Sequence, residues 1–169
     1  MTRIRPHGQQ KEGNNTMDQK KSGYGFGVTL HTPFEQVVAE FKEALKAEGF
    51  GVLTEIDVQQ ILRAKLGVET PLYRILGACD PSLAHRALTE APEIGLLLPC
   101  NVVVRAEGDM TRVDIVDPEA MLRVAGQSGK PEVYTVAAEA KQRLQRGAVG
   151  GRSRGRARLK HSDTAAWTA

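Results

Sequence analysis

The sequence predicts an α+β fold, a two-layer sandwich in which a small, mainly antiparallel or mixed sheet has helices packed on it. Short segments rich in β-branched and apolar residues alternate with amphipathic helical segments in the order β-α-β-α-β-α-β-β-α. A turn at Glu107-Gly108-Asp109 lies between two apolar segments and indicates a hairpin, hence at least one antiparallel strand pair. The length of 169 residues fits one domain with tails.

The first strand and the first helix lie near the N-terminal end of this domain. Residues 24–30 are rich in aromatic and β-branched side chains, and the glycines among them indicate close approach to another strand rather than a phosphate-binding loop. Thr32 is the expected N-cap of the helix, with Pro33 at its first position and Glu35 closing a capping box. Apolar residues follow at helical spacing as far as Gly49, which ends the helix.

The middle of the chain predicts two further strand–helix units. Residues 50–56 form the second expected strand, and the aspartate that follows caps a short helix. After a break at a proline, residues 73–78 form the third strand. Asp80 and Pro81 then combine a capping residue with a proline at the first helical position, which predicts a helix to about Leu88.

The C-terminal part of the domain predicts a hairpin and a helix. Residues 95–104 are expected to form a long apolar strand that is interrupted by Pro99. The turn at 107–109 leads into a returning strand over 111–116. A final amphipathic helix is expected from 131 to about 146, because its apolar residues recur at helical spacing.

Charge divides the chain into three parts. Residues 1–22 carry five Lys/Arg and two Asp/Glu, and residues 147–169 carry five Lys/Arg and one Asp. Residues 23–146 hold the remaining 13 Lys/Arg and 17 Asp/Glu, a net charge of −4. We expect 23–146 to be one folded domain and both ends to be flexible tails, because the ends have few apolar groups to bury. An acidic domain argues against a folded basic surface for nucleic acid.

No segment predicts export or a membrane span. The apolar runs fall far short of the roughly 20 residues that cross a bilayer, and the N-terminus lacks the apolar stretch of a secretory signal. Two cysteines do not make the framework of a disulfide-rich secreted domain. We therefore expect a cytoplasmic protein with no membrane partner, and Met17 is an alternative start of translation.

Three sequence blocks carry a family resemblance across about residues 20–146. They are Glu-Ile-Asp-Val-Gln at 55–59, Tyr-Arg-Ile-Leu-Gly-Ala-Cys-Asp-Pro at 73–81 and Pro-Glu-Ile-Gly-Leu-Leu-Leu-Pro-Cys-Asn-Val-Val-Val at 92–104. In order and spacing this part of the chain resembles the domain of unknown function 302 family. Asp80 stands where many relatives are expected to have asparagine, and both residues cap helices. The resemblance implies a small α+β domain that forms a homodimer and has no agreed biochemical activity.

Cys79 and Cys100 form the candidate thiol site. Cys79 ends a predicted strand just before the cap Asp80; a helix N-terminus favours a thiolate, whereas the charge of Asp80 opposes one. Cys100 lies between Pro99 and Asn101, and the proline signals an edge, bulge or bend that can direct side chains at a site. If the two strands are neighbours, the sulfurs meet. The alternative is that both cysteines are small buried residues.

A metal site would need a third ligand beside the two cysteines. The nearest candidate is His85, about one turn into the helix after Cys79. Two sulfurs and an imidazole suit zinc or copper(I), yet 20 residues separate the cysteines and no CxxC pair is present. The alternative for His85 is a solvated surface histidine. The sequence identifies no other cofactor.

Glu55 and Asp57 are a carboxylate pair that Arg74 faces from the next predicted strand. Acid–base catalysis by such a pair needs burial to raise the pKa of one carboxyl. The favoured interpretation is that Asp57 caps a helix and Glu55 pairs with Arg74. The sequence contains no HExxH and no lysine-containing phosphate loop. Whether the protein is an enzyme stays open.

Three functions are compatible with these features. The first is a homodimeric binding or accessory module, supported by the apolar segment before Pro99 and by the resemblance. The second is a thiol-dependent redox or metal-handling protein that uses Cys79 and Cys100. The third is association with nucleic acid through charges of the C-terminal tail, which are carried by Arg152, Arg154, Arg156 and Arg158.

Overall fold

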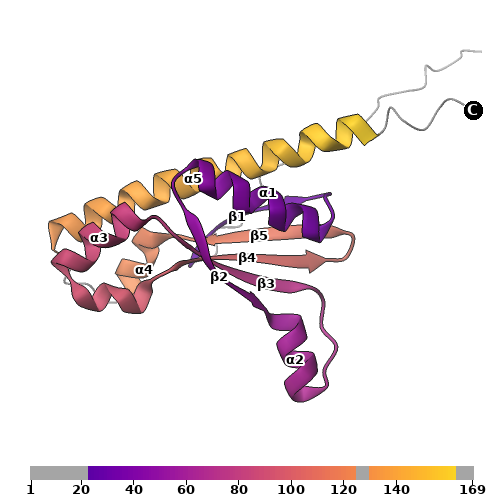
Figure 1. Ribbon diagram of the computed structural model, residues 1–169, viewed down its shortest axis with the longest axis horizontal. Helices are drawn as coiled ribbons and strands as arrows, with labels where there is room; N and C mark the ends of the chain where they lie inside the picture. The colour runs from indigo at the N-terminus through magenta and orange to yellow at the C-terminus, as the bar shows by residue number, and fades with distance from the viewer. Residues whose placement is uncertain (1–22, 125–129, 163–169) are drawn as a thin grey trace, which may run out of the picture.

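One antiparallel sheet of five strands forms the centre of the protein (Figure 1). The computed structural model describes residues 23–124 and 130–162, with side chains described for 23–123 and 130–152. The expected N-terminal tail, 1–22, therefore lies outside the described residues. The strands follow the spatial order β1-β5-β4-β3-β2, and every neighbouring pair is antiparallel. Their bounds are Gly25–Leu30 for β1, Gly51–Asp57 for β2, Tyr73–Cys79 for β3, Cys100–Glu107 for β4 and Met110–Val116 for β5.

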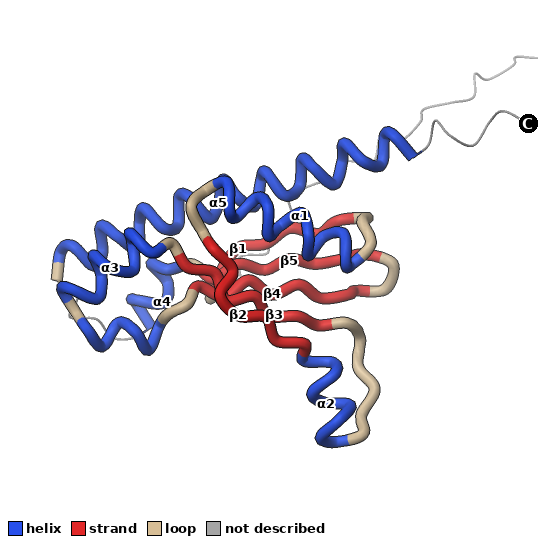
Figure 2. Tube along the Cα trace, viewed as in Figure 1, coloured by secondary structure: helices blue, strands red, loops and turns tan. Residues whose placement is uncertain are grey.

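Helices pack on this sheet, as the predicted α+β sandwich requires (Figure 2). The helices α1 and α5 lie side by side over the sheet, α3 and α4 gather at one end of it, and α2 projects away from it. The helices are α1 (Phe34–Ala47), α2 (Val58–Leu66), α3 (Pro81–Glu90), α4 (Pro118–Val124) and α5 (Pro131–Ser162), with a 3-10 helix η1 (Pro92–Leu97).

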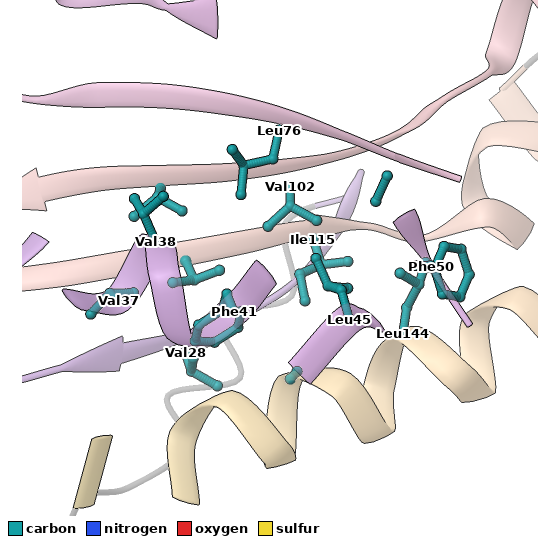
Figure 3. Packing of buried hydrophobic residues seen from close by; sticks show 14 of the residues in the cluster. Val28, Val37, Val38, Phe41, Leu45, Phe50, Leu76, Val102, Ile115 and Leu144 are labelled. Carbon is teal, nitrogen blue, oxygen red and sulfur yellow. The ribbon is translucent and has the colours of Figure 1, made fainter. Parts of the chain in front are cut away.

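The core lies between the sheet and the helices α1 and α5 (Figure 3). Alternate residues of the strands point toward the helices, which follows from the two-residue period of a strand. Val102 and Ile115 from the sheet, Phe41 and Leu45 from α1, and Leu144 from α5 are almost wholly buried there. The apolar spacing that predicted the first and last helices therefore marks their buried faces.

Several local predictions are confirmed. The side chain of Asp57 accepts a hydrogen bond from Gln60 N at 2.9 Å and caps α2. Gly108 has a φ of +63° in the turn between β4 and β5, a conformation that glycine adopts without strain. The glycines of β1 lie against β5, because a Cβ on Gly25 would stand 2.1 Å from the carbonyl oxygen of Ile115.

The predicted start of the first helix is wrong by one residue. Pro33, not Thr32, is the N-cap of α1, and no side chain caps this helix end. Thr32 is buried, and its carbonyl accepts a hydrogen bond from Thr111 Oγ1 on β5 at 2.8 Å. Contact with the sheet thus fixes the start of the helix, and the side chain of Glu35 does not close a capping box.

The strand predicted over 95–104 is also partly wrong. Its first half is helical, because η1 runs from Pro92 to Leu97, and β4 begins only at Cys100. The bond between Leu98 and Pro99 is cis and lies between the two elements. The sequence analysis also missed α4, a helix whose start is capped by Asp117 through hydrogen bonds from Glu119 N and Ala120 N.

The last helix continues well past its expected end near Arg146. It runs to Ser162, and Ala148 belongs to the main core cluster. The glycines that indicated a flexible segment instead face α1, where a Cβ on Gly151 would lie 2.7 Å from the ring of Phe41. Small residues at this contact let the two helices approach closely. No helix in the described ranges is long and apolar enough to cross a membrane.

Candidate functional site

An apolar cavity lies where the ends of β3 and β4 meet the surrounding helices. Its volume is about 70 Å³, and its walls come from β3, β4, β5, α3, η1, α4 and α5. Native interiors contain few voids larger than a water molecule, so this cavity is a feature to explain.

Both candidate cysteines line this cavity. The strands that carry them are neighbours, and the register places Cys100 opposite Ala78 and Asn101 opposite Gly77. Cys79 therefore lies one position beyond the residue that faces Cys100. Both thiols are free and partly buried. The strands that carry the two cysteines are neighbours, whereas the meeting of the two sulfurs stays a prediction.

The surroundings of the two sulfurs favour neutral thiols. Burial raises the pKa of the Cys79 thiol, and the charge of Asp80 raises it further. Burial raises the pKa of Cys100 to about 11, and the nearby Cys79 adds to this shift. A thiolate is the nucleophile and metal ligand among cysteine forms. At neutral pH the pair is therefore a weak nucleophile.

Asp80 joins the cavity wall to helix α5. Its Oδ1 accepts hydrogen bonds from Ser82 N at 2.9 Å, Ser82 Oγ at 2.6 Å and Leu83 N at 3.2 Å, so it caps α3 as predicted. Its Oδ2 accepts a hydrogen bond from Arg143 Nη1 at 2.6 Å. Burial alone would raise the pKa of Asp80, but these bonds and the Arg143 charge outweigh it and lower the pKa.

His85 and Asn101 lie away from the cavity lining. His85 is exposed on α3 and borders a separate surface hollow with Arg86 and Lys130. Asn101 is exposed on β4. Within the part of the chain that the structure describes, no three His, Cys, Asp or Glu side chains are grouped as metal ligands would be. Cys79 and Cys100 therefore both line the cavity, and His85 does not.

Arg74 is the centre of an ion cluster at the other end of β3. Its guanidinium donates two hydrogen bonds to Glu35, at 2.8 and 3.0 Å, and lies 3.3 Å from Glu55 and 3.5 Å from Asp57. The guanidinium also lies 5.3 Å from the centre of the Phe34 ring. The hydrogen bonds to Glu35 are the main cause that raises the pKa of Arg74. Sequence reasoning placed Glu55 beside Arg74 and missed Glu35.

Sequence reasoning also missed most of the cavity lining and its link to α5. Alanines recur at helical spacing in two helices, with Ala84 and Ala87 on α3 and Ala137 and Ala140 on α5, and all four line the cavity. The helical spacing of these alanines was the signal in the sequence that could have indicated the cavity. No local sequence pattern indicates the hydrogen bond between Asp80 and Arg143, which lie 63 positions apart.

A second feature is an apolar surface formed by β2, α2 and the segment that leads to β3. We name it the β2–α2 surface. Helix α2 has no buried residue, although its apolar side chains have helical spacing. The large apolar residues exposed on this surface are Leu53, Ile56, Ile61, Leu66, Val68 and Leu72.

Of the C-terminal arginines, Arg152 is half-buried on α5. The other three also lie within the bounds of α5, and their side chains are outside the described residues. These three are Arg154, Arg156 and Arg158.

Comparison with known proteins gives a family and a structural neighbour. Residues 26–148 match the family model for the domain of unknown function DUF302. The crystal structure of the uncharacterized conserved protein DUF302 from Bacillus stearothermophilus is similar, with a TM-score of 0.70 and 29% identity over 78% of this chain and 100% of that one. No curated protein matches. The family match covers most of the chain and nearly all of the sheet, so the chain belongs to the domain of unknown function DUF302 family.

Proposed function

We propose that the protein is a homodimeric binding module whose two copies meet over the β2–α2 surface. The observation that carries this proposal is helix α2, which has nine residues and none of them buried. An isolated helix shorter than about 12–15 residues is marginal in water and depends on packing of its apolar face. A second copy of the chain supplies that packing.

The exposure of apolar groups supports the same surface. Leu53 on β2 is 66% exposed and Leu66 on α2 is 68% exposed, and four more large apolar side chains of β2, α2 and the segment that leads to β3 are also exposed. Exposed large apolar side chains on adjoining segments are typical of an interaction surface. A single exposed leucine, such as Leu96 on η1, does not indicate an interaction site, because isolated apolar residues are common on protein surfaces.

The symmetry of the surface favours a second copy as the partner. Strand β2 is an edge of the sheet, so one side of its backbone has no neighbouring strand. Two antiparallel β2 strands are related by a two-fold axis, which is the commonest symmetry of oligomers. Glu55 and Asp57 on this edge are drawn toward Arg74 within the protomer, which lessens repulsion between the two edges.

The thiol-dependent alternative has weaker support. Cys79 and Cys100 share a cavity, but both have a raised pKa, which disfavours the reactive thiolate. Two free thiols fit a reducing compartment, so the proposal includes a cytoplasmic location.

Light scattering coupled to gel filtration tests the dimer. We expect the full chain to have twice the mass of one protomer at micromolar concentration. Leu66→Glu places a charge on the β2–α2 surface and should weaken association at least tenfold. Leu96→Glu makes the same change at an exposed leucine outside this surface and should leave the dimer intact. A monomeric wild type, or equal effects of the two variants, would overturn the proposal.

A further inference from the structure

We infer that the cavity bounded by β3, β4 and α3–α5 is a binding site for one small, uncharged, apolar molecule. All of its walls belong to a single protomer. Ligand binding in this cavity therefore does not depend on the dimer proposed above.

Small side chains on two facing helices create the space. Ala84 and Ala87 on α3 and Ala137 and Ala140 on α5 all line the cavity. Pairs of alanines leave room that larger residues would fill. Met121 of α4 also lines the cavity, and a methionine side chain adapts its shape to an occupant.

The polarity of the walls selects an uncharged occupant. Asp80 is the one carboxylate in the lining, and both of its oxygens are already engaged, Oδ1 by the start of α3 and Oδ2 by Arg143. The lining contains no lysine, arginine or histidine, so a charged ligand would find no free counter-charge. A buried water needs two to four polar partners, and the sulfurs of Cys79 and Cys100 are weak hydrogen-bonding groups.

The volume limits the occupant to a few heavy atoms. An engineered apolar cavity of about 150 Å³ in another protein stays dry and binds benzene or xenon. The present cavity of about 70 Å³ is roughly half that size. Xenon, dichloromethane and hydrocarbons of about three carbons match it, whereas benzene requires the walls to move. Small hydrocarbons and halocarbons are therefore the ligand class.

Methyl NMR of the full chain tests the site directly, with xenon and dichloromethane as the probes. We expect saturable shifts at the methyl groups of Leu83, Leu122 and Val136, which line the cavity. The methyl groups of Val28 and Val37, which lie in the core but outside the lining, serve as internal controls. Absence of shifts at the cavity methyls, or equal shifts at both sets, would overturn the inference.

Two variants change the cavity in opposite directions. Ala84→Leu fills it from a half-buried position on α3 and should weaken dichloromethane binding at least tenfold. Ala47→Leu makes the same change at an exposed position on α1 and should leave binding unchanged. Cys100→Ala enlarges the cavity and should allow benzene to bind at least tenfold more tightly than it binds the wild type. Dichloromethane binding that survives Ala84→Leu, or benzene binding that ignores Cys100→Ala, contradicts the site.

Discussion

Asp80 shows how one residue can hold two elements at once. One carboxylate oxygen caps α3, and the other accepts a hydrogen bond from Arg143 on α5. The side chain is 5% exposed, so its charge is stabilised by these partners and not by water. Capping by Asp80 was visible in the sequence because it depends on the next three residues. The Arg143 contact was not, because only the folded chain brings the two together.

Asp80→Asn is predicted to make stability less dependent on pH. Asparagine keeps the cap but removes the charge that faces Arg143, so we expect a loss of about 1–3 kcal/mol at pH 7. The folded-state pKa of Asp80 lies below its unfolded value. Its contribution is therefore present above about pH 4 and is lost as the pH falls through the folded-state pKa. Urea unfolding at pH 7 and pH 3 measures this, and an equal gap between wild type and variant at both values would contradict it.

The two thiols should react slowly and in a fixed order. Burial raises the pKa of both, and the pKa of Cys100 reaches about 11. Alkylation by iodoacetamide at neutral pH should be slower for Cys100 than for an ordinary cysteine, on the order of 100-fold, because only the thiolate attacks. Cys79 should react first. Mass spectrometry of the single variants Cys79→Ala and Cys100→Ala follows each site, and faster alkylation of Cys100 would refute this order.

At the scale of elements, the contact between α1 and α5 explains why the last helix was predicted too short. A run of glycines in sequence indicates high conformational entropy in the unfolded chain. The sequence does not show that these glycines face a neighbouring helix. Gly147 and Gly150 lie near Leu45 and Ala44, and Gly151 lies against the ring of Phe41. Tertiary packing therefore outweighs the local preference.

Two neighbouring glycines of α5 should respond to alanine in opposite directions. A Cβ on Gly150 would lie 3.7 Å from Ala44 Cβ, an ordinary contact, so Gly150→Ala should stabilise the protein by about 0.5–1 kcal/mol through helix propensity. A Cβ on Gly151 would lie 2.7 Å from the fully buried Phe41 ring. Gly151→Ala should therefore destabilise it by about 1–3 kcal/mol. Thermal unfolding compares them, and shifts of the same sign would count against this contact.

The segment between α3 and β4 could not be predicted for a different reason. Residues 94–98 are almost wholly apolar, a composition that suits a buried strand and a buried helical turn equally. The structure resolves this ambiguity through packing, because Ile94 and Leu97 join Leu122 and Val133 in a second small core cluster. That cluster involves α4 and α5, whose positions the sequence does not reveal.

For the whole molecule, the α+β class was predictable and the arrangement of its parts was not. Local patterns identify strands and helices, and the turn at Gly108 identifies one antiparallel pair. The sheet order requires β1 to pair with β5, although about 80 residues separate them along the chain. Within the candidate site, the two cysteines were identified in sequence. The cavity was not, because it results from seven elements meeting.

The length of α5 has an electrostatic consequence. At about 1.5 Å per residue its 32 residues extend about 48 Å, whereas the eight residues of β4 extend about 26 Å. The helix extends past the sheet mainly at its N-terminal end, near α3 and α4 (Figure 1). The positive charges at positions 154, 156 and 158 begin one turn after Gly151, which packs on Phe41, so the first of them lies about 4.5 Å of helix rise beyond that contact and within a Debye length of about 10 Å. The basic end of α5 therefore acts within the electrostatic field of the acidic domain, and added salt weakens the attraction between them.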